Sequence, residues 1–517
     1  MLTPQQVDKY ADKATAAFDE LFTDILKDMA RRIAATGRIT NATRYQAARA
    51  AALTSSTKYL LKKIAEIPTT VTPQLEQVFL DAMNAADRQD AEAYIRAGRP
   101  YVPLEENDAS KQLVNSGFRR TMNTLNNLTQ TRALMDNPNL PMTQQAQLGQ
   151  LLDKAHFQIT SGAFSYTTAI RQAINTLADK GVGAITYPSG HVDSLDVVVR
   201  RAALTGINQT AGDISLNNAM MMGVDTMELS AHAGARTGDG ENDFTNHSWW
   251  QGKLVSISGR DGYLSFDDIG YGHVQGFMGA NCRHNWHPFF EGASVRNYDE
   301  AKLEELNSKT IPYNGEDVPL YEAEHKQRAM ERRIRQLKRR YVLQREAGLD
   351  KDATRTALAL KTSRERLADF LQQTGLNQQA DREAARGFGR SAAAKASGTA
   401  LSVRKRLTAL NKELTALRND GKIKATGEAV FPPKISEDLR FNEHAAMRAA
   451  ERNISLEDAK TFVSTARVAL RQRAGAQYVF YSGVGFAAVQ NNGEILTFGQ
   501  LNEGGKRILE AMRKNGF

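Results

Sequence analysis

Hydrophobic positions recur at three- and four-residue steps through most of the first 220 residues. From Val7 to Ile33 this spacing would place the apolar side chains on one face of a helix. Thr3 is followed by a proline and, three residues on, by Gln6, a pattern that satisfies the first free amides of a helix. We therefore predict one long helix over residues 3–35.

The same spacing continues beyond this helix and is broken at prolines and glycines. The interruptions separate predicted helices over residues 45–67, 73–96, 109–134 and 143–178. We read the chain as helical throughout to about residue 220, and we take residues 1–226 as a helical N-terminal region.

The pattern changes from residue 227 onward. Glycines and aromatic residues become frequent, and short alternating runs such as residues 253–257 are typical of strands separated by loops. Residues 227–320 are therefore predicted to form a loop-rich mixed αβ centre.

A basic stretch follows this centre. Residues 326–340 hold eight basic residues and one acid, with a narrow apolar stripe at helical spacing. We predict a basic amphipathic helix here, within a helical spacer over residues 321–431. Residues 386–406 mix Gly, Ala, Ser and Lys with weak periodicity, so we expect a flexible connection there.

The last part reads as a small α+β domain over residues 435–517. Two helices are predicted, the second opened by Ser455 with Asp458 three residues on, and an antiparallel meander follows with a hairpin turn at 491–493. The fold class is thus a multidomain α+β protein.

Composition limits the function classes. The 517 residues are 41% hydrophobic and 24% charged, which excludes a wholly disordered or fibrous chain. No apolar run is long enough for a membrane span, and the first 13 residues lack the order of a signal peptide. A single cysteine, Cys282, suits a reducing compartment, so we expect synthesis in a cytoplasm.

Four ordered blocks in the centre carry a family resemblance. They are Ser230-Ala231-His232-Ala233-Gly234-Ala235-Arg236, His247 with Trp250-Gln251-Gly252-Lys253, Gly270-Tyr271-Gly272, and Gly279-Ala280-Asn281-Cys282-Arg283-His284. With flanking segments, they make residues 1–375 similar to the phage minor capsid protein 2 family, which is distantly like phage Mu-type head-morphogenesis proteins. One departure is the Gly- and Asp-rich segment 237–246, which looks like an insertion between two histidines.

The resemblance implies a structural role in a tailed phage. It implies a minor capsid protein of the head, present at low copy in the virion, made in the bacterial host and associated with the portal and other head proteins. Apart from a structural zinc, we expect no cofactor.

Residues of the kind that bind zinc fall inside these blocks. His232, His247, Cys282 and His284 offer imidazole nitrogens and a thiolate, and a structural zinc would stabilise a loop-rich unit. The alternative is that the cysteine is a buried apolar side chain and the histidines serve as hydrogen-bond partners. A Cys282 nucleophile with His284 as its base is a third reading, disfavoured because residues two apart rarely face each other.

The basic stretch has two readings of its own. Clustered cations gain affinity for DNA by releasing its counterions, so packaged DNA is one expected partner. The candidate contacts are Arg332, Arg333, Arg335, Lys338, Arg339 and Arg340. The alternative is a solvated helix face.

The C-terminal domain weakly resembles barnase-like and EndoU-like ribonucleases found as toxins on phage head proteins. Helical spacing would bring His444 beside Arg448, and a histidine can act as both acid and base near neutral pH. The candidate catalytic residues are His444, Arg448, Glu451, Arg452, Tyr478 and Thr497. The alternative functions are therefore a metal-independent RNase effector, with RNA as its partner, and a docking module.

Overall fold

The computed structural model describes residues 2–126, 144–161, 166–181, 183–186, 192–433, 435, 439–452 and 455–517. The chain forms two compact units. The first contains Met1–Thr160, Ile170–Gly348 and Ser363–Phe388, and the second contains Ser161–Ala169, Leu349–Thr362 and Gly389–Phe517. The fold class, a multidomain α+β protein, agrees with the sequence prediction.

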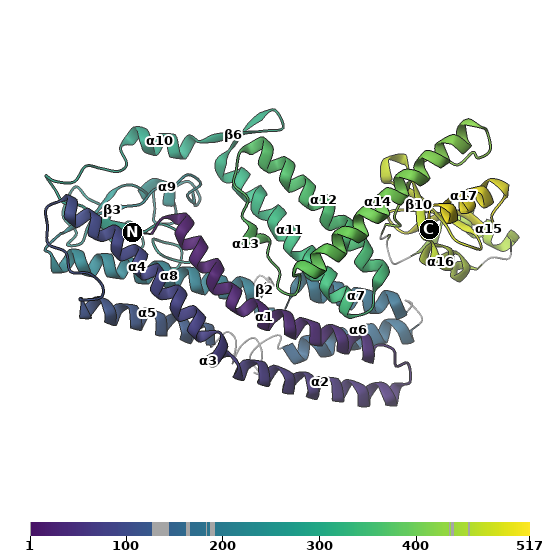
Figure 1. The fold of residues 1–517 in the computed structure, drawn as a ribbon, viewed down its shortest axis with the longest axis horizontal. Coiled ribbons are helices and arrows are strands. Elements are labelled where there is room, and N and C mark those ends of the chain that lie inside the picture. The colour runs from purple at the N-terminus through teal and green to yellow at the C-terminus, as the bar shows by residue number, and fades with distance from the viewer. Residues whose placement is uncertain are drawn as a thin grey trace. The chain divides into compact units, whose positions relative to one another are not determined.

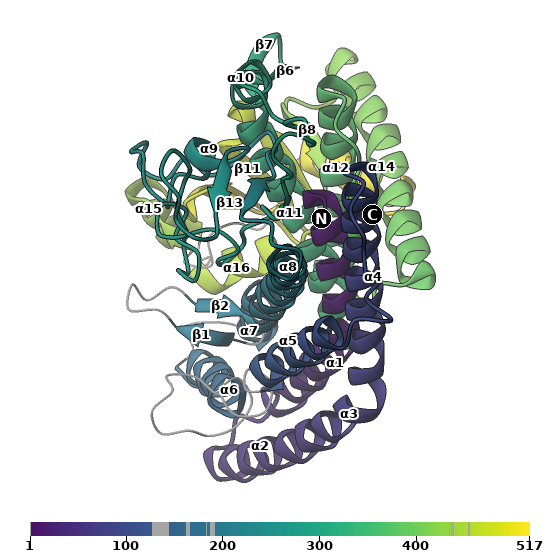
Figure 2. The same ribbon diagram turned by 90° about the vertical axis from the view of Figure 1, so that its left-hand side faces the viewer.

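Four long helices form the core of the first unit: α1 (Pro4–Thr36), α4 (Thr72–Arg96), α5 (Asp108–Asn126) and α8 (Leu195–Met221). Their apolar faces share one cluster that includes Val7, Phe79, Val114 and Ile207, each no more than 5% exposed. These helices lie along one another, and α5 and α8 run side by side (Figures 1 and 2).

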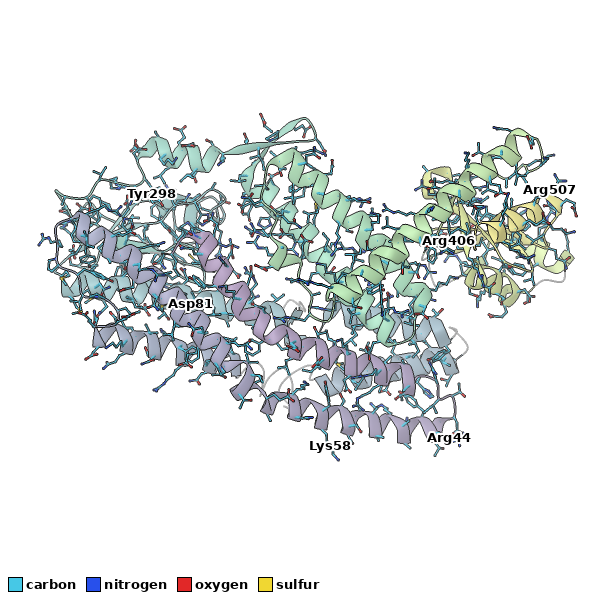
Figure 3. All side chains as sticks on the ribbon, in the orientation of Figure 1. Arg44, Lys58, Asp81, Tyr298, Arg406 and Arg507 are labelled. Carbon is cyan, nitrogen blue, oxygen red and sulfur yellow. The ribbon has the colours of Figure 1, made fainter. Side chains whose placement is uncertain are left out.

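The predicted start of α1 is confirmed. The Thr3 side chain accepts a hydrogen bond from the backbone of Gln6, and the Gln6 side chain accepts one from the backbone of Thr3. Helix α2 (Ala42–Ala65) and the short α3 (Ile67–Thr70) complete the predicted helical stretch. Arg44 and Lys58 project from the exposed side of α2 (Figure 3).

Two predictions for this region are wrong in detail. The helix expected over residues 143–178 is two helices, α6 (Gln144–Thr160) and α7 (Tyr166–Lys180). The chain is not helical throughout to residue 220, because β1 (Gly183–Thr186) and β2 (Val192–Ser194) pair antiparallel before α8. The part of the helix expected over residues 127–134 lies outside the described residues.

The centre is held by a small antiparallel sheet in the order β4-β3-β5: β3 (Thr226–Leu229), β4 (Leu254–Ser256) and β5 (Trp286–Pro288). The strand predicted over residues 253–257 is therefore confirmed. Loops and the one-turn helix α9 (His247–Trp250) surround the sheet. Trp250, Phe277 and Trp286, each at most 1% exposed, fill the core against Met227 and Cys282.

Beyond the centre come α10 (Glu300–Ser308), the hairpin of β6 (Thr310–Tyr313) and β7 (Glu316–Pro319), and helices α11 (Leu320–Glu346), α12 (Asp350–Thr374) and α13 (Ala380–Glu383). Helix α11 contains the predicted basic helix. It buries Ile334, Leu337 and Tyr341 along one stripe, which is the predicted apolar face.

The second unit has a six-stranded sheet in the order β8-β10-β11-β12-β13-β9, antiparallel except for the β13–β9 pair. The strands are β8 (Glu428–Val430), β9 (Arg440–Phe441), β10 (Val468–Gln472), β11 (Gln477–Tyr481), β12 (Phe486–Gln490) and β13 (Glu494–Gly499). Helices α15 (Glu443–Arg452) and α16 (Leu456–Thr465) pack on one face, and α14 (Arg390–Asn419) and α17 (Glu503–Lys514) on the other (Figure 1). The result is a three-layer arrangement.

The local predictions for this unit have mixed outcomes. Ser455 and Asp458 cap α16 reciprocally, and the turn at 491–493 joins β12 to β13, as predicted. The flexible connection expected over residues 386–406 is wrong, because α14 begins at Arg390 and continues for 30 residues. Ala400, Val403 and Leu410 are buried along it, so packing against neighbouring elements orders the segment.

Candidate metal centre

Three of the four predicted metal-ligating residues lie on two segments of the central unit. His247 opens α9, whose first turn is capped by the Asn246 side chain. Cys282 and His284 lie on the turn that leads into β5. Asn281 adopts a left-handed φ of 60°, a conformation that asparagine tolerates better than most residues. This tight turn directs Cys282 and His284 into the core beside α9.

The buried α8 residue Asn208 fixes the turn that carries the cysteine. Its amide group donates to the backbone carbonyl of His284 at 2.9 Å and to that of Cys282 at 3.3 Å. Asn285 returns the contact by donating to the Asn208 side chain at 3.0 Å. A glycine is required at position 279, since a side chain there would collide with the carbonyl of Val274. The long helix α8 therefore sets the position of the candidate ligands.

The structure brings His247, Cys282 and His284 together. One ligand atom from each lies within 4.8 Å of the others, and all three residues are at most 2% exposed. Such a buried group of two imidazoles and one thiol could bind a metal ion.

Hydrogen bonds fix which nitrogen of His284 is free. Its Nε2 lies 3.1 Å from Oε1 of Gln251, and this oxygen also accepts the backbone N–H of His232. The amide nitrogen of Gln251 donates to the side-chain oxygen of Asn307, so the atom of Gln251 that faces His284 is its oxygen. Nε2 of His284 must then carry the proton, which leaves a lone pair on Nδ1, 3.7 Å from the Cys282 sulfur.

The same reasoning shows which ring nitrogen of His247 carries the proton. Its Nε2 lies 2.9 Å from the carbonyl oxygen of Gln275, so this nitrogen donates and Nδ1 keeps a lone pair. Metal-binding histidines commonly donate their second ring nitrogen to a carbonyl or amide oxygen in this way. Gln251 and the Gln275 carbonyl therefore orient two of the candidate ligands.

His232 is placed differently from the other three. Its ring stacks on that of His284 with 4.4 Å between centroids, and it is not part of the closely spaced group. Its Nδ1 lies 3.0 Å from the carbonyl of Ala233, while its Nε2 is buried without a hydrogen-bond partner among the described residues. His232 thus presents one open lone pair beside the group.

Burial determines the ionisation of these side chains. It lowers the pKa of His247 to about 4 and the pKa of His284 well below its usual value, so both rings are neutral at pH 7. Burial also raises the pKa of the Cys282 thiol to about 11. A protonated thiol is a poor nucleophile, so these surroundings fit a packing cysteine better than a catalytic one. A metal ion bound here would have to displace the thiol proton.

The predicted DNA-binding residues of α11 differ in their exposure and in their partners. Arg332 and Arg333 are exposed. Lys338 is buried and donates to the Glu383 carbonyl at 2.7 Å, and Arg340 pairs with Asp179 at 2.5 Å. Arg335 lines a separate small cavity, and Arg339 is half-buried. Only part of the basic set is therefore available at the surface of this helix.

The predicted catalytic residues of the second unit are only partly brought together. His444 and Glu451 are exposed on α15, and Arg448 lies 3.8 Å from the Glu451 carboxylate. Tyr478 packs with the apolar cluster beneath α15, whereas Thr497 pairs with Ala488 and so faces the opposite side of the sheet. The side chain of Arg452 lies outside the described part.

Comparison with known protein families identifies the first unit. A family model described as phage minor capsid protein 2 matches residues 2–372. The chain belongs to the phage minor capsid protein 2 family. It is accordingly a structural protein of the phage head, as its four central blocks predicted. No curated protein and no solved structure matches the chain.

Two further observations concern membrane-spanning helices and the extent of the family match. Within the residues that the structure describes, no helix is long and apolar enough to cross a membrane. The match ends within α12, so α14 to α17 and the six-stranded sheet lie beyond it.

Proposed function

We propose that this minor capsid protein is a low-copy, portal-associated component of the virion, bound to the portal and to other head proteins. The observation that carries the proposal is the family match across residues 2–372. A structural role also fits a first unit built on long packed helices that share one continuous apolar core.

Mass spectrometry of purified proheads and mature virions tests this proposal directly. We expect the chain in both particles at far fewer copies than the major capsid protein, and we expect crosslinks to the portal. Its absence from both particles would reject the proposal. Its presence in numbers equal to the major capsid protein would reject the low copy number.

We further propose that the buried group holds one zinc ion. His247, Cys282 and His284 would supply three ligands, and His232, with its open Nε2, is the candidate for the fourth. Two observations support this: the free lone pair on Nδ1 of both His247 and His284, and the backbone or amide oxygen that holds each ring. The ion would join the α9 loop to the turn before β5 and so stabilise a region with little regular structure.

The second unit carries the alternative function, a metal-independent RNase. Its support is the exposed face of α15 with His444, Arg448 and Glu451, on a unit that has its own core beyond the family match. In this proposal His444 exchanges protons with the attacking 2′-hydroxyl, and Arg448 neutralises the phosphate.

A further inference from the structure

A cavity of about 300 Å³ adjoins the His–Cys–His group. Its walls come from the segment around His232 and Gly234, the start of α9 with His247, the turn that carries Cys282 and His284, and the start of α11. The proposed zinc ligands therefore form one side of this cavity. Three of the lining side chains are arginines: Arg236, Arg283 and Arg328. Among the described residues that line it there is no carboxylate. The cavity is therefore strongly cationic.

The charges of these arginines are only partly neutralised by their neighbours. Arg236 donates to the backbone carbonyls of Gln275 and Ala280, at 3.2 and 3.0 Å, which hold it in place without cancelling its charge. Arg328 pairs with Glu324 at 2.8 Å on the same helix.

Arg283 shares its carboxylate partner with other cations. Its side chain lies 2.9 Å from Asp8, and Asp8 also pairs with Arg200 at 2.8 Å and Arg382 at 2.9 Å. Arg200 also pairs with Asp12 at 2.8 Å, and Arg382 lies 4.0 Å from Glu331. The excess positive charge at the cavity wall is therefore that of Arg236, which has no carboxylate partner among the described residues.

Arg328 also has a buried N–H donor that lacks an acceptor among the described residues. Its Nε atom is buried and makes no hydrogen bond among the described residues. Burial, with the nearby Arg283 guanidinium, lowers the pKa of Arg328, which shows how unfavourable this charge is in its surroundings. A buried donor without an acceptor carries a desolvation cost that an anionic ligand would remove.

We propose that this cavity binds a phosphate group, held among Arg236, Arg283 and Arg328. Guanidinium groups offer paired N–H donors that match the oxygens of a tetrahedral anion. The cavity volume is at the small end of ligand sites, so it suits inorganic phosphate or a terminal phosphate. The arginines are sufficient for this site, which does not depend on zinc.

Calorimetric titration of the full-length chain with inorganic phosphate tests the proposal, with sodium chloride at matched ionic strength as the reference. The titration is performed on chelator-treated and on zinc-loaded protein. We expect saturable binding in both. A 5′-phosphorylated tetranucleotide is then compared with its unphosphorylated form. Binding of the phosphorylated form alone assigns the site to nucleic-acid ends, and binding of neither assigns it to free phosphate.

Two variants and one control locate the binding. Arg236→Gln and Arg328→Gln should each weaken phosphate binding by about ten- to a hundred-fold, the loss of one charge-assisted contact. Arg44→Gln is the matched control, because this arginine is exposed on α2 of the first unit and does not line the cavity. Circular dichroism verifies that each variant is folded, and Arg236 serves alone if Arg328→Gln does not fold.

Three results would overturn the proposal. They are a response to phosphate no larger than that to chloride, equal phosphate affinity in wild type and Arg236→Gln, or binding only in the zinc-loaded protein. The last result would make the anion a ligand of the metal instead of the arginines.

Discussion

At the scale of single residues, the centre depends on where protons sit on its histidines. The open nitrogens of His247 and His284 are set by the oxygens of Gln275 and Gln251, so the ligand group is arranged before any ion arrives. A group arranged in advance loses little conformational entropy on binding.

The zinc proposal predicts about one equivalent of metal in the purified protein, whose removal lowers the melting temperature. Cys282→Ser and His284→Gln should lose the metal, because each removes a ligand atom from a buried group. His444→Ala is the matched histidine control, since it is exposed and belongs to the second unit. Metal retained by both ligand variants would contradict the assignment.

Asp8 gives a second prediction at this scale. Burial would raise the pKa of Asp8, but the guanidiniums of Arg283, Arg200 and Arg382 outweigh it and lower the pKa to about 2. A carboxyl group with a lowered pKa in the folded state contributes stability above its unfolded pKa of about 3.9. That contribution should be lost as the pH falls from about 4 toward 2.

Asp8→Asn should therefore destabilise the first unit at pH 7 by about 2–4 kcal/mol, because it removes the carboxylate that three half-buried guanidinium groups share. Asp108→Asn should change stability little, since the Asp108 side chain is 88% exposed and pairs only with Lys111 at the surface. Denaturant unfolding at pH 7 and pH 3 measures both. A variant as stable as wild type at pH 7 would show that Asp8 is not the centre of this ion-pair network.

At the scale of elements, α11 shows that basic residues close together in the sequence need not all be exposed in the structure. The sequence predicted the helix and its apolar stripe, but it could not show that Lys338 is buried against Glu383 and that Arg340 is paired with Asp179. Which charged side chains face solvent depends on contacts with residues such as Asp179 and Glu383, about 160 and 45 positions away. The surface available for DNA is therefore smaller than the predicted set.

We predict that changing both Arg332 and Arg333 to Glu weakens binding to a DNA duplex and reduces its salt dependence. Each lost phosphate contact lowers the slope of log affinity against log salt by about 0.9. The matched control changes the exposed Arg44 and Lys58 of α2 to Glu. Fluorescence anisotropy at several salt concentrations measures the slope. Equal slopes in wild type and the α11 variant would show that this helix does not bind DNA.

Helix α14 shows where sequence patterns were too weak. Its buried residues Ala396, Ala400, Val403 and Leu410 have helical spacing, but alanines give little hydrophobic contrast and Gly398 interrupts the pattern. The helix forms because it packs in the cluster that also contains strand residues such as Val468, an interaction between distant positions. Strong local signals, such as the caps of α1 and α16, were predicted correctly because they need only neighbouring residues.

The candidate centre was predictable for a similar reason. His247, Cys282 and His284 are chemically distinctive, and they fall in blocks that resemble one family. Gln251, Asn208 and the Gln275 carbonyl were missed, because an amide or a backbone oxygen has no signature until the fold brings it to a ring nitrogen or a carbonyl. The Gln251 position within the second block was the one available hint.

At the scale of the whole molecule, the family match covers only part of the chain. The match ends at residue 372, whereas the six-stranded sheet and its helices follow it with their own apolar clusters. The C-terminal sheet therefore has apolar cores of its own outside the region that defines the family.

The RNase proposal predicts that the full-length chain cleaves labelled single-stranded RNA in the presence of EDTA and that His444→Ala reduces the rate by about 100-fold or more. His273→Ala is the matched control, because His273 is exposed but lies in the first unit. Thr497→Val should have no effect, since its side chain faces the other side of the sheet from α15. RNA left intact by the wild-type chain would leave this unit as a docking module.

The aromatic core of the centre also gives the protein a built-in optical reporter. All three tryptophans of the chain, Trp249, Trp250 and Trp286, belong to this region. The Trp250 ring lies 4.5 Å from His247 and 4.7 Å from His284, centroid to centroid. Intrinsic tryptophan emission therefore arises only around the His–Cys–His group. Its intensity follows events at that group without labelling, while the second unit remains silent at these wavelengths.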